Sequence, residues 1–225
     1  MTTASDERAL ICDLFLELGP DQPTLCEGWT TGDLAAHLIV REHDPLAGAG
    51  IMIKPLASHT ERRMTEVLAA EPWTQVVERL RRGPGQWSLF RVPGVDEGAN
   101  AMEFFIHAED VRRAQTPPLP PRQLSSEVED FFWKRVKLLA RALFRKLDAG
   151  LVLERQDAEG NVLESLRVRS GSHTVTLQGL PSELTLLAYG RGAHAHVTVI
   201  ADEAGVAAME AAGFRTEEPI TESPI

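Results

Sequence analysis

Two residues in the middle of the chain have the types and the spacing of a metal site. Glu103 and His107 lie four positions apart in the segment 100–110, which reads NAMEFFIHAED. On a helix this spacing places both side chains on one face, within reach of one ion. His37 lies in an earlier segment of helical periodicity and is a candidate third donor. Two imidazoles and one carboxylate leave coordination positions open, which suits catalytic zinc and also fits nickel, manganese or ferrous iron.

The spacing alone leaves other interpretations open. Glu103 is the third helical position after Asn100 and could complete a capping box. His37 stands between apolar residues, where a hydrogen-bonded core histidine is the common case. Asp110, seven positions after Glu103, could orient a ligand histidine or be a surface acid. The metal site therefore needs support from a second pattern.

That support is a family resemblance. Segment 25–38, LCEGWTTGDLAAHL, resembles the opening motif of the mycothiol-dependent maleylpyruvate isomerase amino-terminal domain, which belongs to the DinB/YfiT-like superfamily of metal-binding four-helix bundles. The Glu103 and His107 pair is similar to the second metal motif of that family. The resemblance covers about residues 5–150. It implies that His37, Glu103 and His107 hold a divalent metal, and that a thiol such as mycothiol or bacillithiol is the cosubstrate.

The chemistry follows from the open positions of such a metal. A bound divalent ion lowers the pKa of a coordinated thiol or water and so creates a nucleophile near neutral pH. A thiolate that adds to an electrophile gives S-transfer, and one that adds and then leaves gives cis–trans isomerisation. We therefore expect a metal-dependent, thiol-using transferase or isomerase. The alternatives are a non-enzymatic metal- or small-molecule-binding module, and a metal-dependent hydrolase with Asp110 or Glu109 as base.

A small anionic electrophile would require cationic groups to hold it. Arg62 and Arg63 are candidates, although solvated surface charge is the simpler interpretation of both. Arg191 lies between two glycines in an expected loop. The resemblance implies that an arginine in the carboxy-terminal domain is functionally important, so Arg191 is the candidate catalytic residue.

Composition excludes several classes of protein. The 225 residues include two cysteines, Cys12 and Cys26, so neither a disulfide framework nor a thiolate-rich zinc site is expected. No Cys/His/Asp spacing indicates a nucleophilic triad. The formal net charge of −10 argues against nonspecific binding to nucleic acid or to an anionic membrane. We expect a cytoplasmic protein with small-molecule partners, and a homodimer only by analogy with DinB-like bundles.

The elements that must position these residues are helical up to about residue 148. Amphipathic periodicity predicts helices over 5–18, 30–43, 58–70, 72–83, 100–114 and 126–147, with capping boxes at Thr30, Ser58 and Ser126. Alternating apolar residues then predict short strands between 151 and 200. We therefore expect an α+β protein: a DinB-like four-helix bundle over 1–148, a small α+β domain over 149–215, and a disordered acidic tail over 216–225.

Overall fold

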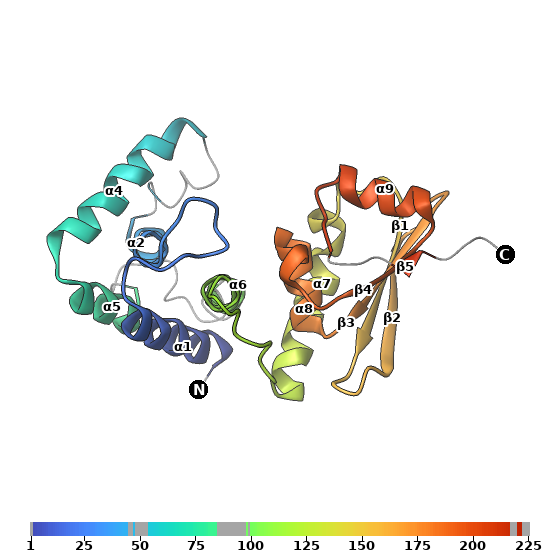
Figure 1. Cartoon of the computed structure of the whole chain (residues 1–225), viewed down its shortest axis with the longest axis horizontal. Helices are drawn as coiled ribbons and strands as arrows, with labels where there is room; N and C mark the ends of the chain where they lie inside the picture. Colours follow the sequence, from blue (N-terminus) through green and yellow to red (C-terminus); the bar gives the residue numbers. More distant parts are fainter. Residues whose placement is uncertain are drawn as a thin grey trace. The chain divides into compact units, whose positions relative to one another are not determined.

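The computed structural model describes residues 2–44, 47, 54–84, 98, 100–216 and 220–221. The chain forms two compact units, residues 1–121 and 122–225, each of which is described by itself. Most of the segment that links the helices expected over 72–83 and 100–114 lies outside the described residues, as does most of the expected tail. The fold is α+β, as expected, and Figure 1 shows its helices and strands along the chain.

The first unit is helical. Its elements are α1 (Thr3–Leu18), α2 (Thr31–His43), the 3-10 turn η1 (Lys54–Leu56), α4 (Ala57–Ala70), α5 (Trp73–Arg82) and α6 (Ala101–Arg113). Helix α6 packs against α1, while α2 packs against α4 and α5. The four-helix arrangement suggested by the resemblance stays a prediction.

Local capping sets where α2 begins. The Thr30 side chain accepts a hydrogen bond from the Asp33 backbone, and the Asp33 carboxylate accepts one from the Thr30 backbone at 2.9 Å. This is the expected capping box, which satisfies two backbone donors that the helix leaves unpaired. The box expected at Ser58 does not form, because α4 begins at Ala57 and its cap residue, Leu56, makes no side-chain cap hydrogen bond.

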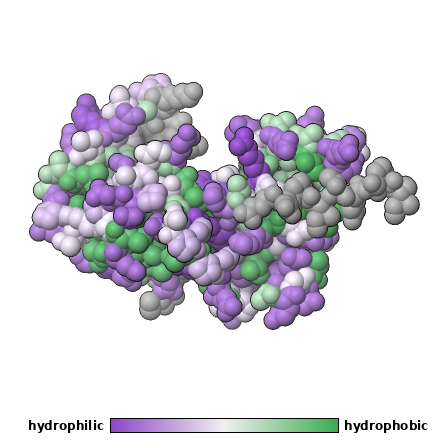
Figure 2. Space-filling view, in the orientation of Figure 1, coloured by the Kyte–Doolittle hydropathy of each residue, from purple (hydrophilic) through white to green (hydrophobic). Residues whose placement is uncertain are grey.

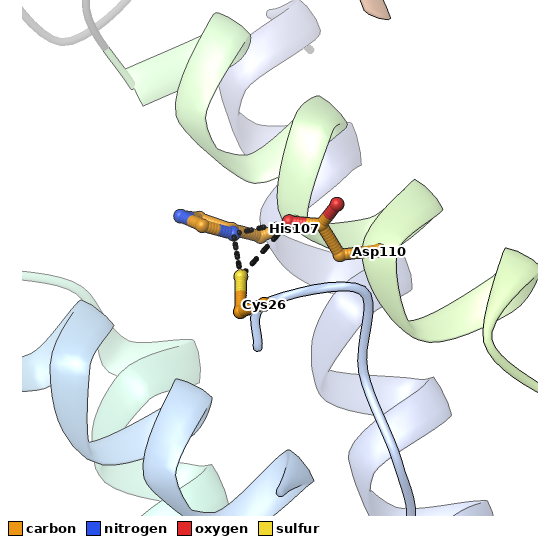
Figure 3. A group of neighbouring side chains, drawn as sticks. All are labelled: Cys26, His107 and Asp110. Atoms are coloured by element: carbon orange, nitrogen blue, oxygen red, sulfur yellow. Dashed lines mark hydrogen bonds and ion pairs between the residues drawn. The ribbon is translucent and has the colours of Figure 1, made fainter. Parts of the chain in front are cut away.

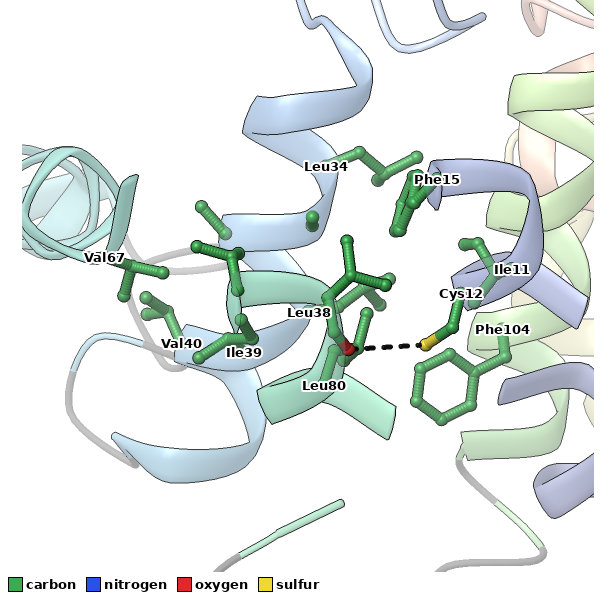
Figure 4. Packing of buried hydrophobic residues seen from close by; sticks show 14 of the residues in the cluster. Ile11, Cys12, Phe15, Leu34, Leu38, Ile39, Val40, Val67, Leu80 and Phe104 are labelled. Carbon is green, nitrogen blue, oxygen red and sulfur yellow. Dashed lines mark hydrogen bonds between the residues drawn. The ribbon is translucent and has the colours of Figure 1, made fainter. Parts of the chain in front are cut away.

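The core of the first unit is apolar and tightly packed between these helices. Side chains from α1, α2, α5 and α6 meet there, and Figure 4 shows Ile11, Phe15, Leu34, Leu38 and Phe104 among them. Cys12 is fully buried in this cluster, as expected, and its thiol lies 3.9 Å from the carbonyl oxygen of Val77. This core fixes which faces of α2 and α6 remain available for chemistry.

The second unit is an α+β layer. It contains α7 (Ser126–Leu143), β1 (Gly150–Gln156), β2 (Val162–Arg169), β3 (Thr174–Gly179), α8 (Pro181–Leu186), η4 (Leu187–Arg191), η5 (Gly192–His194), β4 (Thr198–Ala201), α9 (Glu203–Ala211) and β5 (Ile220–Thr221). The sheet order is β2-β1-β3-β4-β5, in which β1 pairs with β3 and β4 with β5 in parallel and the other pairs are antiparallel.

Three expectations about the organisation change. Helix α7 packs against α8 and β2, so the boundary lies at Pro121/Arg122 and not near Asp148. The capping box expected at Ser126 does not form, because Ser126 is the first residue of α7 and not its cap. The carboxylate of Glu129, which would complete that box, instead accepts hydrogen bonds from the backbone N–H and the hydroxyl of Ser182 at 2.9 and 2.8 Å. Within the tail expected to be disordered, Ile220 and Thr221 form β5.

The surface carries both hydrophobic and hydrophilic residues. On the face shown in Figure 2, hydrophobic residues are interspersed with hydrophilic ones. Among the described residues, no helix is both long and apolar enough to cross a membrane.

Candidate metal centre

Helices α2 and α6 bring His37, Glu103 and His107 together. The Nε2 atom of His37 lies 3.2 Å from Oε1 of Glu103, and Nε2 of His107 lies 3.3 Å from the same oxygen. The ring centroids of the two histidines are 5.3 Å apart. One potential ligand atom from each residue thus lies within 4.8 Å of the others.

This donor set fits a divalent ion of the zinc type. Nitrogen and oxygen ligands at about 2.0–2.1 Å from a tetrahedral ion lie about 3.3 Å from one another. The distances of 3.2 and 3.3 Å to Glu103 have this value before any ion is considered. Glu103 keeps 28% of its side-chain surface exposed, whereas His37 and His107 keep 4% and 11%. Solvent therefore reaches the group on the side of the carboxylate.

The other interpretations of Glu103 and His37 can now be tested. Asn100 precedes α6 but makes no side-chain cap hydrogen bond, and the Glu103 carboxylate faces the two imidazoles. Glu103 therefore does not complete a capping box. Nε2 of His37 contacts Glu103, while its buried Nδ1 atom has no hydrogen-bond partner among the described residues. His37 is thus not a histidine whose polar atoms are all satisfied within the core.

The pKa values of the three candidate ligands shift in different directions. Burial lowers the pKa of His37, although its hydrogen bond with Glu103 opposes this. Burial opposes ionisation of Glu103 as well, but the hydrogen bonds from His107 and His37 and the nearby Arg41 hold the pKa of Glu103 well below its usual range. In the metal-free protein the carboxylate is therefore charged and His37 is neutral.

His107 has a second set of partners on the other side of its ring. Its Nδ1 atom lies 2.9 Å from Oδ2 of Asp110, and the Cys26 thiol donates to the same oxygen at 3.2 Å (Figure 3). Burial works against a charged imidazole, but the hydrogen bonds with Asp110, Cys26 and Glu103 raise the pKa of His107. Asp110 thereby holds the proton on Nδ1, which leaves Nε2 as the nitrogen that faces Glu103.

Cys26 joins this group, although no spacing in the sequence predicts it. Cys26 is 81 positions from His107 in the chain, and its Sγ atom lies 3.8 Å from Nδ1. The backbone N–H of Leu25 donates to the carbonyl of Asp110 at 3.1 Å and holds the loop against α6. In a Cys/His/Asp triad the thiol and the carboxylate contact different ring nitrogens. Here both lie at Nδ1, so the arrangement is not that of a nucleophilic triad.

Arg41 is a further residue of the site that the sequence analysis did not single out. It follows His37 by one helical turn, and its Nε atom lies 3.5 Å from Oε1 of Glu103. Its Nη1 donates to the side-chain carbonyl of Asn100. The sequence contains one indication of this role: Arg41 is four positions after His37, which places a cation on the same face of α2 as a candidate ligand.

The three arginines that the sequence suggests for anion binding make no contact that is described with the candidate ligands. Arg63 forms ion pairs with Asp44, at 3.0 Å, and with Glu66. Arg62 is 65% exposed and lies 3.9 Å from Glu66. Both therefore fit surface charge. Arg191 belongs to the second unit, where its Nη1 donates to the carbonyl of Tyr189 at 2.7 Å, so its catalytic role stays a prediction.

A groove of 670 Å³ is lined in part by Trp29, a neighbour of His37, and not by the candidate ligands themselves. Gly28, Trp29 and Asp33 line one side, and residues of α4 that include Met64 and Leu68 line the other. The Trp29 ring lies 5.0 Å from the His37 ring, centroid to centroid. Trp29 is thus shared between the groove and the three candidate ligands.

Comparison with known proteins supports the fold. No protein-family model matches the chain, and no curated protein matches its sequence. Two solved structures are similar: the mycothiol-dependent maleylpyruvate isomerase, with 18% identity and a TM-score of 0.50, and a histidine-to-alanine variant of it, with 16% identity and a TM-score of 0.51. Each match covers 88% of this chain and 90% of the other. The two proteins share a distant likeness of fold. At this identity the likeness extends to the arrangement of the chain and not to its activity.

Proposed function

We propose that this protein is a divalent-metal enzyme that uses a small thiol as cosubstrate and acts on a small electrophile, as an isomerase or an S-transferase. The approach of His37 and His107 to the same carboxylate oxygen of Glu103 is the observation that carries the proposal. Similarity of fold to a mycothiol-dependent isomerase favours the thiol as the species that reacts.

The residues of the chain would divide the work. His37, Glu103 and His107 would hold the ion. A divalent ion bound there would lower the pKa of a thiol that coordinates it. Asp110 holds the Nδ1 proton of His107, so this imidazole keeps one tautomer and one orientation. Trp29 packs beside His37 and lines the groove, so its ring would offer a surface for the organic part of a ligand.

Three donors favour a catalytic ion over a closed structural one. Among the described residues, the group at Glu103 Oε1 contains His37, Glu103 and His107. Cys26 and Asp110 lie at Nδ1 of His107, on the far side of the ring from Nε2. A structural ion would need a fourth protein donor, so the arrangement supports an enzyme over a non-enzymatic binding module. A metal-dependent hydrolase would use the same ligands and differs in needing no thiol.

The decisive experiment measures metal and thiol binding together. The parent protein should bind one equivalent of zinc or cobalt, and Glu103→Ala and His107→Ala should weaken that binding at least a hundredfold. His59→Gln changes a histidine of α4 and serves as the control that leaves binding unchanged. Equal metal affinity in parent and ligand variants would disprove the site.

Thiol binding is then read from the cobalt-substituted parent. Mycothiol, bacillithiol or a simpler thiol should change the visible spectrum of the bound cobalt, because sulfur would enter its coordination sphere. Hydrolysis of simple esters in the absence of thiol, with no spectral response to any thiol, would instead assign the hydrolase alternative.

A further inference from the structure

Among the described residues, Arg41 is a cation that forms an ion pair with a candidate ligand. Its Nε atom lies 3.5 Å from the same Glu103 oxygen that both histidines approach. Its side chain is 15% exposed, so the charge is largely withdrawn from solvent and is weakly screened. A divalent ion bound by Glu103 would therefore have a second positive charge beside it.

Hydrogen bonds with buried polar side chains hold Arg41 in its position. Asn100 is fully buried, accepts from Arg41 through Oδ1, and donates through Nδ2 to Oε1 of Glu42 at 3.0 Å. Glu42 is itself buried and is paired through both carboxylate oxygens with Arg8, at 2.5 and 2.7 Å. Buried polar groups are costly unless they are satisfied, so this chain of contacts holds the guanidinium in one place.

Arg41 adds one positive charge to the metal-loaded site, before a thiolate or another anion binds. With His37 and His107 neutral, the charged side chains whose ion pairs involve the candidate ligands are Glu103, Asp110 and Arg41, while Glu42 and Arg8 behind them balance each other. The two carboxylates balance a divalent ion, and Arg41 then leaves one positive charge in excess. Such a site attracts an anion, and a guanidinium recognises planar anions such as carboxylates through two parallel N–H donors.

We propose that Arg41 is a specificity-determining residue, which binds an anionic group of the ligand beside the metal. The inference deepens the proposed function and rests on it, because it concerns the metal-loaded site. It replaces Arg62 and Arg63 as the anion-recognising groups of the first unit.

The test measures anion affinity, not turnover. The cobalt-substituted parent is titrated with acetate and with acetamide, its neutral counterpart, and binding is read from the visible spectrum. Arg41→Gln should weaken acetate binding about 10- to 100-fold, because a hydrogen bond to a charged group is lost. Acetamide binding should change little, and Arg41→Lys should restore part of the acetate affinity. Arg62→Gln is the matched control and should behave like the parent.

A merely structural Arg41 predicts the opposite pattern. If the residue only held Asn100 and Glu103 in place, Arg41→Gln would weaken metal binding and leave the preference for acetate over acetamide unchanged, which would overturn the inference. If Arg41→Gln does not fold, Arg41→Lys decides: unchanged acetate affinity argues against bidentate recognition by Arg41, and a clear loss supports it. Metal and thiol binding in the parent test the proposed function separately, so each proposal can fail alone.

Discussion

Oδ2 of Asp110 lies 2.9 Å from Nδ1 of His107, while Nε2 of the same imidazole lies 3.3 Å from Glu103. The two ring nitrogens of one histidine thus serve two different groups. Asp110 is fully buried and one turn further along α6, so any effect of Asp110 on a bound metal would pass through His107.

The first prediction concerns this orienting carboxylate. Asp110→Asn should lower metal affinity about 10- to 100-fold, because the amide no longer fixes the Nδ1–H tautomer of His107 with a charged acceptor. Competition with a chromophoric chelator measures the change, and Asp21→Asn, at an exposed position, is the control. An Asp110→Asn protein with the metal affinity of the parent would show that the contact does not tune the site.

The second prediction is a pH dependence of metal binding. Hydrogen bonds with Asp110, Cys26 and Glu103 raise the pKa of His107 despite its burial, so the metal-free protein binds a proton there at neutral pH. An ion at Nε2 requires the singly protonated ring, so binding releases that proton and tightens as pH rises, by up to about tenfold per pH unit below the pKa of His107. Calorimetry in two buffers of different ionisation enthalpy measures the released proton. Binding that weakens as pH rises from 6 to 8 would contradict this assignment.

The third prediction separates the two thiols. Burial raises the pKa of Cys12 to about 12, and its side chain is fully enclosed, so it should resist iodoacetamide in the native protein. Cys26 is half-buried in a loop and should be the thiol that reacts. Mass spectrometry before and after denaturation counts the modified thiols, and Cys26→Ser should remove the native reaction. Native modification of Cys12 would mean that the packing in Figure 4 opens readily.

Alkylation of Cys26 should also weaken the candidate site. The thiol donates to Asp110 at 3.2 Å, and a carbamidomethyl group cannot occupy the same space. Metal affinity of the alkylated protein should therefore fall in the direction of the Asp110→Asn variant. The Cys26→Ser protein treated with iodoacetamide, which lacks this thiol, controls for modification elsewhere.

The fourth prediction tests the start of α2. Thr30→Ala removes the capping box and should reduce the free energy of unfolding by about 1 kcal/mol. Ser58→Ala is the comparison, because Ser58 has the sequence pattern of a cap but α4 begins before it. Chemical denaturation should show a loss for Thr30→Ala and a change within about 0.5 kcal/mol for Ser58→Ala. Equal losses would place the helix starts elsewhere.

Much of the fold follows from local patterns. Amphipathic spacing predicted the helices that carry His37 and Glu103, and the box at Thr30 is confirmed. The unit boundary was misplaced, because the sequence of α7 shows an apolar face but not which neighbour covers it. The cap pattern at Ser58 fails because α4 begins one residue earlier. In the pattern at Ser126, the carboxylate of Glu129 binds Ser182 instead of the helix start.

The sequence by itself determined which residues share a helix face. Glu103 and His107 are four positions apart, as are His37 and Arg41, and helical periodicity alone puts each pair side by side. Only the tertiary structure decided that these two faces meet, that Arg41 approaches Glu103, and that Cys26 reaches Asp110 from 84 positions away. The physical reason is that periodicity fixes the rotation of a residue about its own helix axis. The packing of the core and the path of the loop fix which helix faces which.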